Sequence, residues 1–254
     1  GITYVRFQKE VDGKIEVTDQ KHIMRYQQMF AALIVRQKID EGVTSGVIWH
    51  TQGSGKTALS YNLTYVLSDY FSKHDKVAKF YFIVDRLDLL KQASDEFEAR
   101  GLVVKTANSR AELMEQFRTN QAQEGNSGKP EITVVNIQRF EEDREKVDLP
   151  AYATNLQRVF IIDEAHRGYK PEGSFLANLL DADKNAIKIA LTGTPLLKEE
   201  RESWRVFGNY LHTYYFQKSM RNLKHWLKRK MLRKIRLLNT IIMLKNCSGI
   251  LSLI

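Results

Sequence analysis

The segment "HTQGSGKT", residues 50–57, places glycines, a lysine and a threonine at a spacing that suits phosphate binding. Glycine lets backbone N–H groups turn toward a phosphate, and a helix N-terminus adds a partial positive charge. Lys56 would neutralise phosphate oxygens, and the Thr57 hydroxyl would coordinate Mg²⁺. An apolar run precedes the segment and an amphipathic pattern follows it, which are the strand and helix that such a loop requires. The alternative is a loop that only caps a helix; we predict a nucleotide site made by Thr51, Gln52, Gly53, Ser54, Gly55, Lys56 and Thr57.

Two adjacent carboxylates follow another apolar run, in "VFIIDEAHRG". This order places Asp163 and Glu164 at the C-terminal edge of a strand, where α/β sheets bind ligands. One carboxylate would hold Mg²⁺, and its neighbour would orient or deprotonate a water, as hydrolysis of a γ-phosphate requires. Standing alone, the pair would be interpreted as two solvated acids at the end of a strand.

A third apolar run, in "IALTGTP", ends in small polar residues. Thr192 and Thr194 would sense the γ-phosphate or link it to another surface of the protein. Alone, this segment would be an ordinary strand followed by a turn. The three strand ends in this order indicate a nucleotide-hydrolysing site far more specifically than any one of them alone. They predict catalytic roles for Lys56, Asp163 and Glu164, and they predict Thr57 and Asp163 as metal ligands.

The elements that must position these residues alternate between strands and helices along the chain. Asp12-Gly13 indicates a hairpin turn, and the next segment predicts a helix with Asp19 as its N-cap and Gly42 just past its end. Continuous Val/Ile runs between helical patterns indicate an α/β fold with a mostly parallel sheet and helices on both faces. The expected strands include "SGVIWH", "KVAKFYFIV", "LVVKTA", "EITVVNI", "RVFIID" and "AIKIAL".

The net charge of +9 is unevenly distributed. Residues 203–254 hold 11 Lys and Arg and no acidic residue, so the basicity that would suggest nucleic acid belongs to the end of the chain. One cysteine fits a reducing, cytoplasmic location, and the absence of about 18 uninterrupted apolar residues argues against a membrane span.

Together these motifs resemble the first RecA-like motor domain of superfamily 2 helicases and translocases. In finer detail the chain resembles the R (motor and nuclease) subunit of type I restriction enzymes, a P-loop NTPase. The closer match rests on "RYQQMFAA", "GVIWHTQGSGKT", "FIVDRLDLLKQ", "VVNIQRF", "IIDEAHRG" and "ALTGTPL". A histidine at the first position of the phosphate loop, here His50, is typical of that family.

The resemblance implies further roles and partners. Gln28, with Arg25 nearby, would read the adenine of ATP, since a glutamine amide can bond both N6 and N7 of that ring. His166 would join Thr192 and Thr194 in coupling nucleotide state to DNA contact. Double-stranded DNA is the implied partner, together with the methylase and specificity subunits of the restriction complex, and the DNA backbone would be contacted by Arg86, Gln138 and Arg139.

The match covers roughly residues 21–216, after an N-terminal hairpin or linker at residues 1–20. We expect the nuclease domain and the second RecA-like lobe of the family to be absent from this chain. The basic tail, residues 217–254, does not resemble the family. Leu223, Leu227, Met231 and Ile235 would line one side of an amphipathic helix there, although a boundary segment or a shifted reading frame is the favoured interpretation.

The predicted function is an ATP-dependent DNA translocase domain of a type I restriction endonuclease, with ATP and Mg²⁺ as cofactors. Alternatives are another superfamily 2 helicase ATPase, or a domain that binds nucleotide without turnover on its own. A P-loop kinase is disfavoured, because "DEAHR" with "LTGTP" argues for water as the phosphoryl acceptor.

Overall fold

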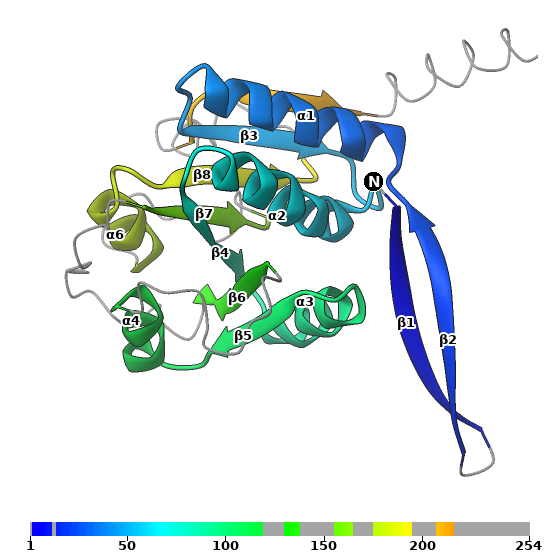
Figure 1. Ribbon diagram of the computed structural model, residues 1–254. Helices are drawn as coiled ribbons and strands as arrows, with labels where there is room; N and C mark the ends of the chain where they lie inside the picture. The colour runs from blue at the N-terminus through cyan, green and yellow to red at the C-terminus, as the bar shows by residue number, and fades with distance from the viewer. Residues whose placement is uncertain are drawn as a thin grey trace, which may run out of the picture. The chain divides into compact units, whose positions relative to one another are not determined.

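A parallel sheet of seven strands organises the chain, as the computed structural model shows (Figure 1). The structure describes residues 2–11, 14–118, 130–137, 155–164, 175–194 and 207–215. The strand order is β5-β6-β4-β7-β8-β3-β9. Their bounds are β3 Ser45–His50, β4 Val77–Val84, β5 Val103–Ala107, β6 Glu131–Asn136, β7 Leu156–Ile162, β8 Ile187–Thr192 and β9 Tyr210–Tyr214. The predicted α/β class with a mostly parallel sheet is therefore confirmed.

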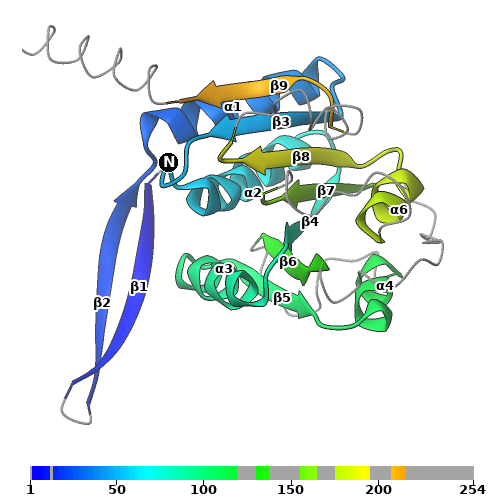
Figure 2. The ribbon, with the colours of Figure 1, turned by 180° about the vertical axis from the view of Figure 1, so that it is seen from behind.

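Helices cover both faces of this sheet (Figures 1 and 2). One hydrophobic cluster joins alternate strand residues to α1 Tyr26–Asp40, α2 Lys56–Ser72 and α3 Leu87–Ala99. The other joins the remaining strand residues to α4 Arg110–Arg118 and α6 Phe175–Ala182. Side chains of a strand alternate between the two faces, so consecutive residues such as Phe82 and Ile83 enter different clusters. This explains why the strands are continuously apolar.

The N-terminal hairpin forms as the Asp12-Gly13 signal predicted, from β1 Ile2–Val11 and β2 Lys14–Ile23. The predicted helix start at Asp19 is wrong. Asp19 lies in β2 opposite Arg6, and the two side chains form an ion pair of 3.0 Å. Pairing with β1 thus overrides the helical pattern up to Ile23, and the helix begins at Tyr26. Its predicted end is confirmed, because Gly42 follows the last turn with φ of +86°.

Strand β9 was not predicted from the sequence. It lies at the edge of the sheet beside β3, where the Val47 N–H donates to the Asn209 carbonyl at 3.0 Å. Leu211 of β9 fills the space where a side chain at Gly46 would stand. None of the described helices combines the length and the apolar composition that crossing a membrane would need.

Candidate nucleotide site

The phosphate loop joins β3 to α2, as the sequence predicted. Gly53 and Gly55 have φ of +75° and +83°, in the left-handed region that glycine tolerates best. Gly55 is the N-cap residue of α2, so the loop leads directly into the N-terminus of a 17-residue helix. A Cβ built on Gly53 would meet no atom within 4 Å, so open space lies beside the loop there. These features give the loop a backbone suited to an anion.

Lys56 and Glu164 meet beside this loop, although they lie far apart in the chain. The Lys56 Nζ is 3.2 Å from the Glu164 Oε1, and the lysine side chain is only 8% exposed. A Cβ built on Gly193 would lie 3.1 Å from the same Nζ. The ends of β3, β7 and β8 therefore converge on the amine of Lys56.

Asp163 lies in the same place with its Oδ1 atom buried and without a hydrogen-bond partner among the described residues. Its backbone N–H donates to the Ile83 carbonyl of β4 at 2.9 Å, which fixes the residue at the end of β7. Burial, and after it the neighbouring Glu164 carboxylate, raise the pKa of the Asp163 carboxyl to about 6, although the charge of Lys56 acts to lower it. A buried carboxylate oxygen that lacks a partner is a suitable ligand for a divalent cation.

Glu164 has φ of +47°, a conformation that residues other than glycine rarely adopt. Such a backbone typically costs on the order of 1 kcal/mol or more, and it persists where the surrounding structure fixes it. Here it turns the Glu164 carboxylate toward Lys56 immediately after the strand.

The third predicted segment ends β8 beside the loop. Trp49 of β3 and Thr192 of β8 are paired in register, so Thr192 lies next to the start of the phosphate loop. Thr192 is fully buried, and its Oγ1 donates to the Thr194 carbonyl at 3.0 Å and accepts from the Thr194 N–H at 3.3 Å. These bonds tighten the turn that brings Gly193 against Lys56.

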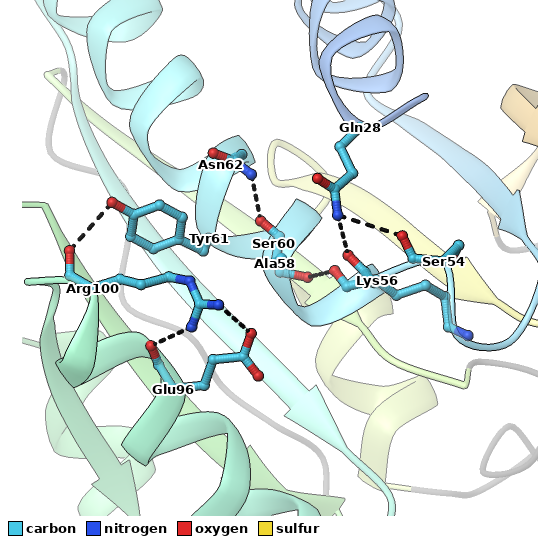
Figure 3. Close-up of polar contacts among 10 residues, drawn as sticks. Gln28, Ser54, Lys56, Ala58, Ser60, Tyr61, Asn62, Glu96 and Arg100 are labelled. Carbon is cyan, nitrogen blue, oxygen red and sulfur yellow. Dashed lines mark hydrogen bonds and ion pairs between the residues drawn. The ribbon is translucent and has the colours of Figure 1, made fainter. Parts of the chain in front are cut away.

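Gln28 contacts the loop directly (Figure 3). Its Nε2 donates to the carbonyls of Ser54 and Gly55, at 3.4 Å and 3.0 Å, and its Oε1 accepts from the Arg25 N–H at 2.9 Å. The side chain is 4% exposed. Gln28 therefore supports the loop as well as the start of α1, where Arg25 is the N-cap residue.

A hollow of about 420 Å³ opens beside Gln28. Arg25, Gln28, Gly53 and Gly55 line it, and so do residues that the sequence did not single out, namely Lys21, His22, Tyr61, Asn62 and Arg100. The Tyr61 hydroxyl donates to the Arg100 carbonyl at 3.2 Å, and the Arg100 guanidinium lies 5.8 Å from the centre of the Tyr61 ring (Figure 3). No motif marks these residues, because the ends of β2 and α3 reach α2 only in the folded chain.

Thr57 follows Lys56 as the second residue of α2, and the predicted residues not yet placed lie just after β4 or outside the described residues. Arg86 is exposed at the N-cap of α3, just after β4. Gln138, Arg139 and His166 lie outside the described residues, as does the tail at residues 217–254.

A glycine-rich loop between a parallel strand and a helix, facing two carboxylates at the end of another strand of the same sheet, defines the P-loop NTPase class. The chain belongs to the SWI2/SNF2 ATPase family, which it matches over residues 27–225.

The endonuclease subunits of type I restriction enzymes are homologues of this chain. The subunit of the Staphylococcus aureus (strain COL) enzyme SauCOLORF180P is 34% identical over 200 residues, which are 75% of this chain and 20% of that protein. The subunit of the Haemophilus influenzae enzyme HindI is 27% identical over 234 residues, or 84% of this chain and 21% of that protein. The chain thus spans about 20% of the length of the curated relatives it matches. The predicted family is confirmed.

Among solved structures, the DNA-bound, ATP-dependent Type ISP restriction-modification enzyme LlaBIII has a TM-score of 0.56 and 16% identity. The similarity covers 83% of this chain and 16% of that one. At this identity the comparison shows a shared fold.

Proposed function

We propose that this chain is the first ATPase lobe of a motor that binds ATP with Mg²⁺ and hydrolyses it to translocate double-stranded DNA, within the endonuclease subunit of a type I restriction enzyme. The observation that carries the proposal is the meeting of Lys56, Asp163 and Glu164 at the C-terminal edge of the sheet, where the Asp163 Oδ1 atom has no hydrogen-bond partner in the described part of the chain. The cytoplasm, where such DNA is found, is the proposed location.

The phosphates of ATP would bind the loop from Thr51 to Thr57. Lys56 would move its charge from Glu164 to the β- and γ-phosphate oxygens, which frees the Glu164 carboxylate. Glu164 would then orient the attacking water and take its proton, as the water oxygen bonds to the γ-phosphorus and ADP leaves. Thr57 and Asp163 fit Mg²⁺, which when bound would neutralise charge on the phosphates.

The hollow beside Gln28 would take the adenine. The Gln28 Nε2 atom already donates to two loop carbonyls, so donation to adenine N7 would require one of these bonds to be exchanged. Arg25 and Gln28 would therefore recognise the base and relay its presence to the loop. The volume of about 420 Å³ is in the range of small-ligand sites.

The proposal also includes residues that would couple the nucleotide site to DNA. Thr192 and Thr194, with His166, would transmit the state of the γ-phosphate. Arg86, Gln138 and Arg139 would contact DNA phosphates without reading sequence. The methylase and specificity subunits would be the protein partners, and the arginines that complete the ATP site would come from a second lobe.

The test compares DNA-stimulated ATP hydrolysis by this chain and by a version extended through a second lobe. We expect turnover to require the extension, and Lys56→Ala to abolish nucleotide binding in both forms. An ATP affinity unchanged by Lys56→Ala would remove the proposal.

Two other functions are distinguished with the same two forms of the chain, when DNA strand separation is measured beside ATP hydrolysis. A helicase ATPase of another kind would separate DNA strands in the extended form, whereas the proposed translocase would move along duplex DNA without separating it. A domain that only binds nucleotide would remain inactive even after extension.

A further inference from the structure

Two histidines connect the phosphate loop to the edge strand of the sheet. His50 is the last residue of β3 and the first of the loop, and it is only 1% exposed. Its Nε2 atom lies 2.7 Å from the Nδ1 atom of His212 on β9. One of these ring nitrogens must carry a hydrogen and the other must accept it, so the contact fixes the orientation of both rings.

The contact lies at the end of a well-defined strand pair. Along β9, the Tyr210 ring lies tilted beside Trp49 with ring centres 5.9 Å apart, Leu211 packs over Gly46, and His212 contacts His50. On the other side of β3, Trp49 is paired with Thr192 of β8. The start of the phosphate loop is thus held between β8 and β9.

We propose that His212 is a positioning residue for the phosphate loop and acts through His50. The loop leaves β3 at His50, so the ring contact sets the direction in which the backbone of Thr51 to Gly55 departs. Since Gly53 and Gly55 give the loop conformational freedom, a fixed first residue reduces the number of backbone arrangements that compete with the phosphate-binding one. This inference rests on the proposed nucleotide site.

The two nitrogens involved allow a matched set of variants. Asparagine places its amide near the position of histidine Nδ1, whereas glutamine places it near Nε2. His212 uses Nδ1, so His212→Asn should preserve the contact and His212→Gln should lose it. The reverse holds for His50, which uses Nε2: His50→Gln should preserve the contact and His50→Asn should lose it.

The experiment measures the affinity of the full 254-residue chain for a fluorescent ATP analogue with Mg²⁺, in competition with ATP. The melting temperature of each variant is recorded, and binding is measured well below it. We expect His212→Ala and His212→Gln to weaken binding by about fivefold, the equivalent of one hydrogen bond, and His212→Asn to bind within about twofold of the unmodified chain. His74→Ala, which removes an exposed histidine at the end of α2, is the control and should change nothing.

Equal affinities for His212→Asn and His212→Gln would overturn the proposal, because a merely structural role does not depend on which nitrogen is replaced. If His212→Ala fails to fold, the comparison of the Asn and Gln variants still decides. Lys56→Ala separates this proposal from the nucleotide site itself. If Lys56→Ala binds as tightly as the unmodified chain, the proposed site fails, and this inference with it. If Lys56→Ala abolishes binding while all His212 variants bind normally, only the positioning role fails.

Discussion

Asp163→Asn should stabilise the fold, because the buried carboxylate is costly to ionise. The same substitution should abolish hydrolysis, because it replaces a carboxylate proposed to hold Mg²⁺. Its pKa is raised from 3.8 to about 6, first by burial and then by Glu164. The native state therefore holds a proton more tightly than the unfolded state, and stability from this group is lost as the pH rises from about 4 through 6. A pKa shift of this size lowers the free energy of unfolding by roughly 3 kcal/mol at pH 7.5, relative to a carboxyl that stays neutral. Asparagine resembles the neutral acid and avoids that cost.

The assay is urea-induced unfolding of both proteins at pH 7.5 and pH 5, without nucleotide. We expect Asp163→Asn to raise the free energy of unfolding by up to about 3 kcal/mol at pH 7.5 and by about half of that at pH 5. Asp69→Asn, which neutralises an exposed carboxylate on α2, is the control and should have little effect at either pH. A gain that is absent at pH 7.5, or equal at the two pH values, would refute the assignment of Asp163 as a buried carboxylate that is costly to ionise.

Three further substitutions test other parts of the structure. Glu164→Gln should leave ATP bound and lower turnover of the two-lobe form by about 100-fold or more, and undiminished turnover would show that Glu164 does not handle the water. Gly46→Val should lower the free energy of unfolding by about 1–3 kcal/mol, because the added side chain overlaps Leu211. Combining it with Leu211→Ala should relieve the overlap, so additive losses in the double variant would contradict the contact. Arg158→Met should lower the free energy of unfolding, measured by chemical denaturation, by about 3–5 kcal/mol, because it removes the guanidinium that lies 3.2 Å from the buried Asp183 carboxylate. Adding Asp183→Asn should recover part of that loss, and no recovery would argue against the ion pair.

The sheet and the convergence of the strand ends on Lys56 could be predicted because their signals are local. A continuous apolar run indicates a buried parallel strand, and the polar residues that follow it must lie at the sheet edge. Asp163, Glu164 and Thr192 directly follow or terminate such runs, and the phosphate loop connects another run to Lys56, so their meeting required only the correct strand order.

Features that depend on tertiary pairing were missed. Asp19 looks like a helix cap in the sequence, but its pairing with Arg6 keeps it in a strand. Strand β9 has five residues, and it exists as a strand because β3 offers it an edge. The His50–His212 contact follows from that pairing and so had no sequence signal.

The strand order also determines when the candidate nucleotide site becomes complete during synthesis. Strands β3 and β7 are not neighbours, since β8 lies between them and pairs with both. A nascent chain that already contains Lys56 and Glu164 cannot bring them together until Ile187–Thr192 has left the ribosome and inserted. On the proposed function, ATP would bind and stabilise only chains whose central sheet is finished, so its binding would select chains that have completed folding.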